Sequence, residues 1–295
     1  MDNAKLKWIY LLILSLIWGS SFILIKHSLE GLTPTQVGAL RIVITALFLF
    51  PVGLKSLKKL KREHWKWVLW TGLLGSFFPP FLFAIAQTEL DSSIASMLNS
   101  LTPLNTVVFG ILFFGVLVTK RQALGVFVGL IGALLLITAG ADFNPDQNYW
   151  MSILIIISTI GYGLNVNMIK RYLNDVDALA IATGNFIIIV IPAVIILAWT
   201  GFFSTIGNDL KMQEALLYVC VLSLFGTAIA KVLFNRLVQV ASPVFASSVT
   251  YTMPVIAIFW GLFFGERLSM YQILGGIIIL FGVYLVNKRA KKTAV

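Results

Sequence analysis

Two cationic side chains lie inside apolar stretches of this 295-residue sequence. Arg41 lies eight residues into the stretch 33–54, and Lys231 lies near the middle of the stretch 213–237. A Lys or Arg at the centre of a membrane-spanning helix costs about 2.5–3.5 kcal/mol of insertion free energy, so it normally faces a cavity or a partner. We therefore expect these two residues to mark a polar site inside a helical membrane protein.

Carboxylates are missing from the centres of the apolar stretches. All twelve Asp and Glu residues lie in loops or near the ends of the stretches. The ones nearest to membrane depth are Glu30, Glu89, Asp91 and Glu266. A cationic centre without a carboxylate favours substrates with a carboxylate or another acidic group. It also favours exchange or facilitated diffusion over proton coupling.

Other polar and aromatic residues could complete a binding site. Lys231 belongs to a polar row at helical spacing that also contains Ser223, Thr227 and Asn235. Structural alternatives stay open, because Lys231 could pair with carbonyls, Arg41 suits a structural role at the cavity edge, and the asparagines could link helices. The predicted substrate-binding residues are Trp18, Arg41, Phe83, Asn99, Tyr162, Asn165, Lys231, Asn235 and Tyr251.

Two prolines are candidate hinges. Pro103 and Pro254 lie inside apolar stretches, and the internal repeat described below superimposes them. Proline removes a backbone hydrogen bond and kinks a helix, and broken helices near the midplane expose carbonyl groups. We hypothesise that both kinks are gating hinges.

Composition identifies the elements that must position these residues. Hydrophobic residues make up 59% of the chain and charged residues only 12%, against roughly 25% charged residues in a soluble domain. A spanning helix needs about 20 apolar residues. The qualifying stretches are residues 8–29, 33–54, 66–88, 92–116, 121–140, 149–170, 176–200, 213–237, 242–264 and 270–287. The sequence therefore predicts an all-α membrane protein with ten transmembrane helices.

The distribution of basic residues predicts the orientation. Segments 5–7, 55–66, 120–121, 170–171 and 288–292 lie on one side of the membrane and hold 16 of the 22 Lys and Arg residues. Only Lys26, Lys211 and Arg267 lie on the other side. The positive-inside rule then places both termini in the cytoplasm. The net charge of +10 is explained by this topology, so we do not expect nucleic-acid binding.

The chain repeats itself once, in halves 1–145 and 146–295. A shift of 144 positions sets Trp18 on Tyr162. A shift of 151 positions sets Gly75, Phe83 and Pro103 on Gly226, Phe234 and Pro254. Five spans per half is an odd number, so the second half must cross the membrane in the opposite sense. Inverted repeats of this kind are typical of transporters with a binding site near the midplane, where the halves meet.

The order of several motifs resembles the drug/metabolite transporter superfamily, and most closely its EamA-type ten-span carriers. The resemblance rests on Trp18-Gly19-Ser20-Ser21, Arg41, Ala95-Ser96 leading to Pro103, and Gly265-Glu266-Arg267-Leu268-Ser269. It covers about residues 8–287. It implies a bacterial or archaeal plasma membrane protein that exports or takes up small metabolites. The first half departs from the pattern, with Gly115-Val116-Leu117 where the second half has Gly265-Glu266-Arg267.

We expect an alternating-access transporter, either exporter or exchanger, of small organic metabolites such as amino acids or other carboxylated compounds. A lipid or lipid-linked sugar flippase is the alternative, and a membrane enzyme is a remote one. The two histidines, His27 and His64, fall on opposite sides of the membrane, and Cys220 is the single cysteine. We therefore expect no catalytic cluster, cofactor or metal. The choice between monomer and homodimer stays open.

Overall fold

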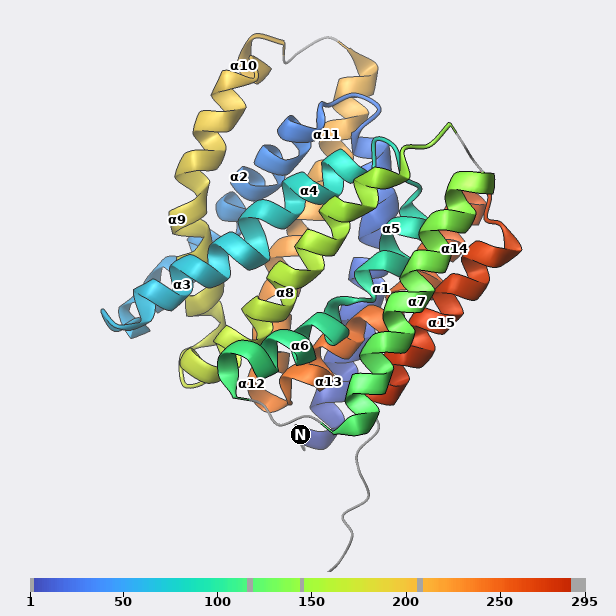
Figure 1. The fold of residues 1–295 in the computed structure, drawn as a ribbon. Coiled ribbons are helices and arrows are strands. Elements are labelled where there is room, and N and C mark those ends of the chain that lie inside the picture. The colour runs from blue at the N-terminus through green and yellow to red at the C-terminus, as the bar shows by residue number, and fades with distance from the viewer. Residues whose placement is uncertain (1–2, 116–118, 144–145, 206–208, 288–295) are drawn as a thin grey trace, which may run out of the picture.

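A computed structural model describes residues 3–115, 119–143, 146–205 and 209–287. All regular secondary structure in these ranges is helical (Figure 1). Three earlier predictions fall outside the described residues. They concern Val116 and Leu117, residue 145 at the predicted boundary between the halves, and the basic tail from Lys288 to Lys292.

Within the described ranges, nine helical segments are long and apolar enough to cross a membrane. A tenth apolar helix, α15 (Met270–Asn287), has 18 residues. At 1.5 Å per residue it is about 27 Å long, close to the ~30 Å hydrocarbon core. The prediction of an all-α membrane protein with ten spans is confirmed.

Six of the described spans are continuous. They are α1 (Asn3–Ser28), α2 (Pro34–Gly53) with the 3₁₀ segment η1 (Leu54–Lys59), α7 (Lys120–Phe143), η3 (Tyr149–Met151) with α8 (Ser152–Tyr172), α9 (Ala178–Trp199) with the short α10 (Phe202–Thr205), and α15.

The other four spans are interrupted, at equivalent places in the two halves. The third span is α3 (His64–Gly72), the π-helical η2 (Leu73–Phe77) and α4 (Phe78–Ala86). The eighth span is α11 (Leu210–Ser223), the π-helical η4 (Leu224–Ile229) and α12 (Ala230–Val240). Both π segments begin at positions related by the shift of 151. Because π segments are frequent at functional sites, this recurrence makes both spans candidates for the site.

The fourth and ninth spans are interrupted in another way. The fourth is α5 (Ser92–Asn99) and α6 (Thr102–Phe114), and the ninth is α13 (Pro243–Ser247), the 3₁₀ segment η5 (Ser248–Tyr251) and α14 (Met253–Phe263). Pro103 and Pro254 lie in the first turns of α6 and α14, where a missing N–H costs little. The breaks precede the prolines, so the structure differs from the expected kinks within continuous helices. The hinge role stays a prediction.

Spans of the two halves pack against each other. Thus α2 packs on α9, α6 on α8, and α1 on α14. To one side, α7 and α15 lie together (Figure 1). Their backbones approach so closely that a Cβ on Gly282 would lie 2.5 Å from the nitrogen of Gly129. Small residues permit such contacts between helices in lipid.

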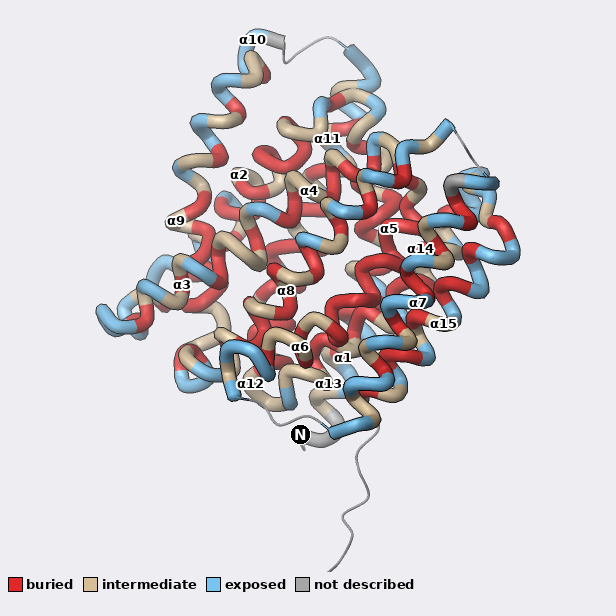
Figure 2. The backbone as a smooth tube through the Cα atoms, in the orientation of Figure 1, coloured by how far each residue is buried: buried red, intermediate tan, exposed pale blue. Residues whose placement is uncertain are grey.

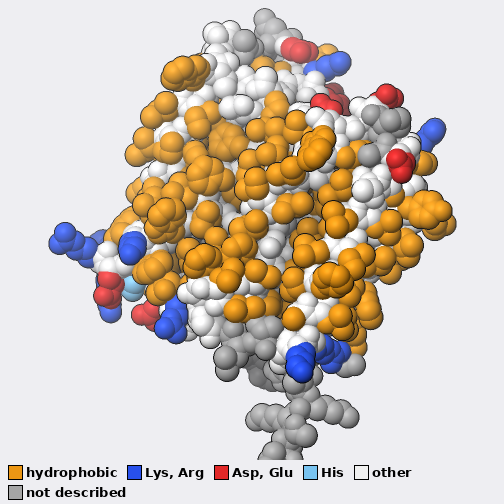
Figure 3. All heavy atoms as spheres, in the orientation of Figure 1, with side chains coloured by type: hydrophobic (Ala, Val, Ile, Leu, Met, Phe, Trp, Pro, Cys, Tyr) orange, Lys and Arg blue, Asp and Glu red, His pale blue; other side chains and the backbone are white. Residues whose placement is uncertain are grey.

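The surface agrees with a membrane location. Buried residues gather where the helices meet, and exposed residues follow the outer faces (Figure 2). Apolar side chains cover the middle of the visible face, whereas charged side chains gather toward its ends (Figure 3). Large apolar side chains such as Trp150 and Trp199 are 79% and 89% exposed. A surface of this kind is suited to lipid rather than to water.

Candidate functional site

A cavity of about 880 Å³, including its open part, lies among the interrupted spans. It receives side chains from both halves. Seven of the nine predicted substrate-binding residues line it, namely Trp18, Arg41, Phe83, Asn99, Tyr162, Asn165 and Lys231. Residues that are distant in sequence thus meet where the two halves join.

Aromatic side chains form matching parts of the wall. The rings of Trp18 and Phe234 meet edge to face, with centroids 5.0 Å apart. The rings of Tyr162 and Phe83 stack with centroids 6.3 Å apart. Each pair joins one residue of either half, and the repeat shifts of 144 and 151 convert one pair into the other. The wall therefore has the same construction on its two sides.

The π segments contact the aromatic spans through glycine. A Cβ on Gly226 of η4 would lie 2.7 Å from Ser21 Oγ, and a Cβ on Gly75 of η2 would lie 2.7 Å from Asn165 Cγ. The indole N–H of Trp18 donates to the Gly226 carbonyl at 2.8 Å. A Cβ at either position would displace the facing side chain, so glycine permits the close contact of α1 with η4 and of α8 with η2.

Arg41 connects α2 to the π segment of the eighth span. Its Nε donates to Thr227 Oγ1 at 2.8 Å. One turn further along α2, the Thr45 hydroxyl donates to the Ser223 carbonyl at 3.2 Å. Arg41 also lines the cavity. It therefore has a structural contact, as its sequence position suggested, and at the same time faces the space that a substrate could occupy.

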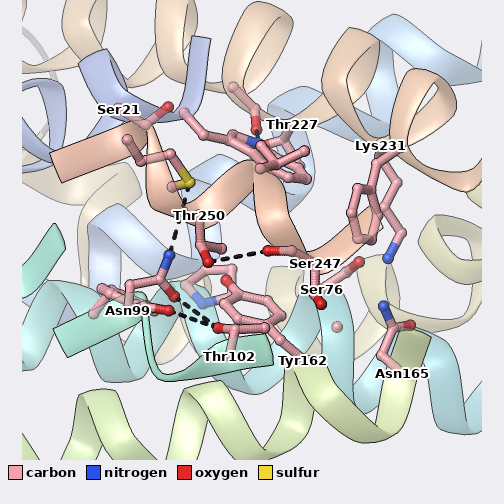
Figure 4. A pocket seen from close by; sticks show the side chains of 18 of the residues that line it. Ser21, Ser76, Asn99, Thr102, Tyr162, Asn165, Thr227, Lys231, Ser247 and Thr250 are labelled. Carbon is pink, nitrogen blue, oxygen red and sulfur yellow. Dashed lines mark hydrogen bonds between the residues drawn. The ribbon is translucent and has the colours of Figure 1, made fainter. Parts of the chain in front are cut away.

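Lys231 is the cavity's second cation. It follows η4 directly on α12, and only 6% of its surface is exposed. The structure gives its ammonium no hydrogen bond or ion pair with any described residue. Figure 4 shows the ammonium pointing toward Asn165 on α8. A buried charge without a partner is costly, so a group that enters the cavity and pairs with Lys231 is stabilised there.

Polar atoms on the opposite walls also lack partners. The Oγ of Ser76 and the Oδ1 of Asn165 are buried and accept or donate no hydrogen bond. Nearby, the Thr102 hydroxyl donates to the Asn99 carbonyl at 2.8 Å, and the Asn99 amide approaches Met253 Sδ at 3.9 Å (Figure 4). The break between α5 and α6 thus places Asn99 on the cavity wall.

Two predicted residues lie elsewhere. Asn235 is fully buried, and its amide donates to the Ala178 carbonyl at 3.3 Å, linking α12 to the start of α9. The Tyr251 hydroxyl donates to the Val283 carbonyl at 3.3 Å, linking η5 to α15. Asn235 belongs to the predicted polar row, but both residues make contacts with neighbouring helices instead of lining the cavity.

The nine predicted substrate-binding residues did not include Ser76, Gly226 or Thr227, although Thr227 belongs to the predicted polar row. A signal for them was present. Gly226 recurs as Gly75 under the shift of 151, and the same shift relates Ser76 to Thr227. The local π geometry that turns these residues to the cavity has no comparable signature in the sequence.

The fold and cavity define a helical membrane transporter. The model of the EamA-like transporter family matches residues 6–138 and again residues 149–288. The chain belongs to the EamA-like transporter family. It is a multi-pass membrane transporter of small molecules and not an enzyme.

Individual relatives agree with this assignment. The chain is 28% identical to an uncharacterized inner membrane transporter, YedA, of Escherichia coli K12, over 93% of this chain and 88% of the relative. It is 25% identical to an S-adenosylmethionine/S-adenosylhomocysteine transporter of Chlamydia muridarum, over 85% and 81% of the two chains. A solved structure at 17% identity has a TM-score of 0.67 and covers 97% of each chain, so the two share a fold.

Proposed function

We propose that this chain is an alternating-access secondary transporter, exporter or exchanger, of a small organic metabolite that carries an anionic group. The supporting observation is Lys231. Its ammonium is buried at the central cavity, without a partner among the described residues, and none of the lining residues is Asp or Glu. An entering carboxylate would supply the missing counter-charge. Amino acids and other carboxylated compounds fit this description.

Alternating access is supported by the duplicated construction. The aromatic pairs, glycine contacts and helix interruptions occur in both halves, so the halves can exchange conformations around one central site. Together with the basic segments, the proposal places both termini in the cytoplasm and the protein in the plasma membrane.

The Chlamydia relative suggests a probe pair for the same cavity. S-adenosylmethionine carries a sulfonium cation that S-adenosylhomocysteine lacks, and both carry a carboxylate. Because Arg41 and Lys231 repel an added cation, we expect S-adenosylhomocysteine to bind more tightly than S-adenosylmethionine.

The test compares ligand-induced thermal stabilisation of the purified protein and its Lys231→Met variant. The probes are 3-phenylpropionate and 2-phenylethylamine, which have similar shapes and opposite charges. A ligand at 100 times its Kd stabilises by about 2.7 kcal/mol, which a melting curve detects. Arg236→Met is the matched control, because Arg236 is an exposed cation on the same helix.

We expect the carboxylate to stabilise the wild type and the Arg236→Met control but not Lys231→Met. If the amine stabilises all three proteins equally and the carboxylate stabilises none, the proposed anionic substrate is wrong. The assignment to the transporter family does not depend on this result.

A further inference from the structure

The cavity contains two cationic side chains that form no ion pair with a carboxylate of any described residue. Arg41 and Lys231 both line it, and none of its lining residues is acidic. Three acidic residues next to spans have described contacts away from Arg41 and Lys231. Asp91 pairs with Lys26, Asp177 pairs with Lys59, and Glu266 accepts hydrogen bonds from Ser92 and Ser93. Any counter-charge inside the cavity must therefore come from a bound molecule.

Both cations have unused hydrogen-bond donors. A guanidinium has five N–H donors in a planar fork, and Thr227 takes only the one on Nε of Arg41. The four donors on the terminal nitrogens have no acceptor among the described residues. This free edge matches a carboxylate or phosphate in a bidentate arrangement. The three donors of the Lys231 ammonium are also unused.

The two cations offer separate binding points. Arg41 is held at Thr227 of η4, and Lys231 lies four residues further along the same span. Figure 4 shows the ammonium of Lys231 turned away from Thr227, toward Asn165. A ligand with one anionic group at Lys231 would leave the Arg41 fork unneutralised, and a buried cation without a counter-charge is unfavourable.

Aromatic rings form part of the cavity wall, beside the polar residues already described. Trp18 and Phe234 from one side and Tyr162 and Phe83 from the other face the same space. The part of a ligand that connects two anionic groups would therefore pack against aromatic rings. These rings favour a connector that has an apolar or aromatic part.

We propose that the transported metabolite is a dianion with two separate acidic groups, one bound by Arg41 and the other by Lys231, joined by a connector that has an apolar or aromatic part. The inference rests on the proposed function, since it takes the central cavity as the transport site. It goes further by giving Arg41 a direct part in substrate selection.

The experiment measures Kd values for matched acids by tryptophan fluorescence of the purified full chain. The probes are 1,4-phenylenediacetate against phenylacetate, and glutarate, adipate and suberate against hexanoate. We expect at least one dicarboxylate to bind at least about tenfold more tightly than its monocarboxylate, as a hydrogen bond to a second charged group would give. Arg41→Met and Lys231→Met should each remove this difference. Thr227→Val keeps Arg41 and removes only the hydroxyl that accepts from its Nε. This variant should retain most of the difference in Kd between dicarboxylates and monocarboxylates.

The wild-type series alone can overturn the inference, whether or not Arg41→Met folds. If monocarboxylates and dicarboxylates bind equally and Lys231→Met abolishes both, the anionic substrate stands and the dianion is wrong. If a dicarboxylate binds more tightly but a folded Arg41→Met protein retains the full difference, Arg41 is not the second site. If no acid of either series binds, the proposed function fails as well.

Discussion

Replacing Glu266 with Gln should loosen the start of α5. Glu266 follows α14 in the chain, and its carboxylate accepts hydrogen bonds from the backbone N–H groups of Ser92 at 2.8 Å and Ser93 at 3.0 Å. Both serine hydroxyls also donate to it. The side chain thus satisfies two N–H groups at a helix N-terminus, where a negative charge is also favourable.

The expected loss follows from these four contacts. In Glu266→Gln the remaining oxygen keeps two donors but loses its charge, which weakens each bond by about 1 kcal/mol. The new amide nitrogen faces the Ser93 N–H and leaves that donor unsatisfied, at a cost of about 1–3 kcal/mol. Because Glu266 is partly exposed, water can hydrogen-bond to the donors that lose their partner, which reduces the destabilisation. A net destabilisation of about 2 kcal/mol remains, which corresponds to a Tm lower by about 4 °C in a chain of this size.

The assay is thermal unfolding of the purified variants in detergent, with Glu89→Gln as the matched control. Glu89 lies close to Ser92 in the chain and accepts no hydrogen bond from a described residue. We expect the control to melt within about 1 °C of the wild type, as surface substitutions usually do. If Glu266→Gln melts with the control, the carboxylate does not stabilise α5 and this reasoning is wrong.

Two further predictions concern helix packing and pH. In Gly282→Ala the new Cβ would meet backbone atoms of Gly129 and Gly125 at 2.5 and 2.6 Å, so we expect α7 and α15 to separate and stability to fall by more than about 2 kcal/mol. Gly276→Ala is the control, because its Cβ meets the flexible Met97 thioether instead of backbone. If thermal melts show the same loss of stability in both variants, contact with backbone atoms is not the cause. Burial, and next the Glu266 carboxylate, raise the pKa of Asp91, while Gln147 and Lys26 oppose this. The Asp91 carboxyl therefore keeps its proton to higher pH in the folded protein than in the unfolded chain. As a result, the free energy of unfolding falls as pH rises from about 4 through the folded-state pKa of Asp91. In thermal melts recorded from pH 4 to 7, Asp91→Asn should lose less stability with rising pH than the wild type. If both proteins lose stability in parallel, the decline does not come from Asp91.

The sequence was sufficient to predict the spans and seven of the residues that line the cavity. Apolar stretches of about 20 residues must be helical in lipid, because backbone groups there have no water to bond, and the predicted windows agree with the helices found. Arg41 and Lys231 were identified because a cation at membrane depth needs a polar environment. Both line the cavity in the structure.

Side-chain direction beyond the interruptions could not be predicted from periodicity. The π segment η4 changes the number of residues per turn within the eighth span, so the four-residue spacing from Ser223 to Asn235 does not keep these side chains on one face. Lys231 points to the cavity, whereas Asn235 bonds to Ala178. The role of Glu266 was equally inaccessible, since its partners Ser92 and Ser93 are distant in sequence.

Under the proposed function, the duplicated residues would serve the movement and the unique residues would select the substrate. The aromatic pairs and the two glycine contacts occur in both halves, as alternating access would require. The cations are not duplicated. The repeat shifts set Arg41 on Asn185 and Lys231 on Pro80, and Asn185 instead bonds the Val68 carbonyl at 2.6 Å. A substitution in the duplicated set should therefore slow the transport of every substrate, whereas a substitution of Arg41 or Lys231 should change which substrates are accepted.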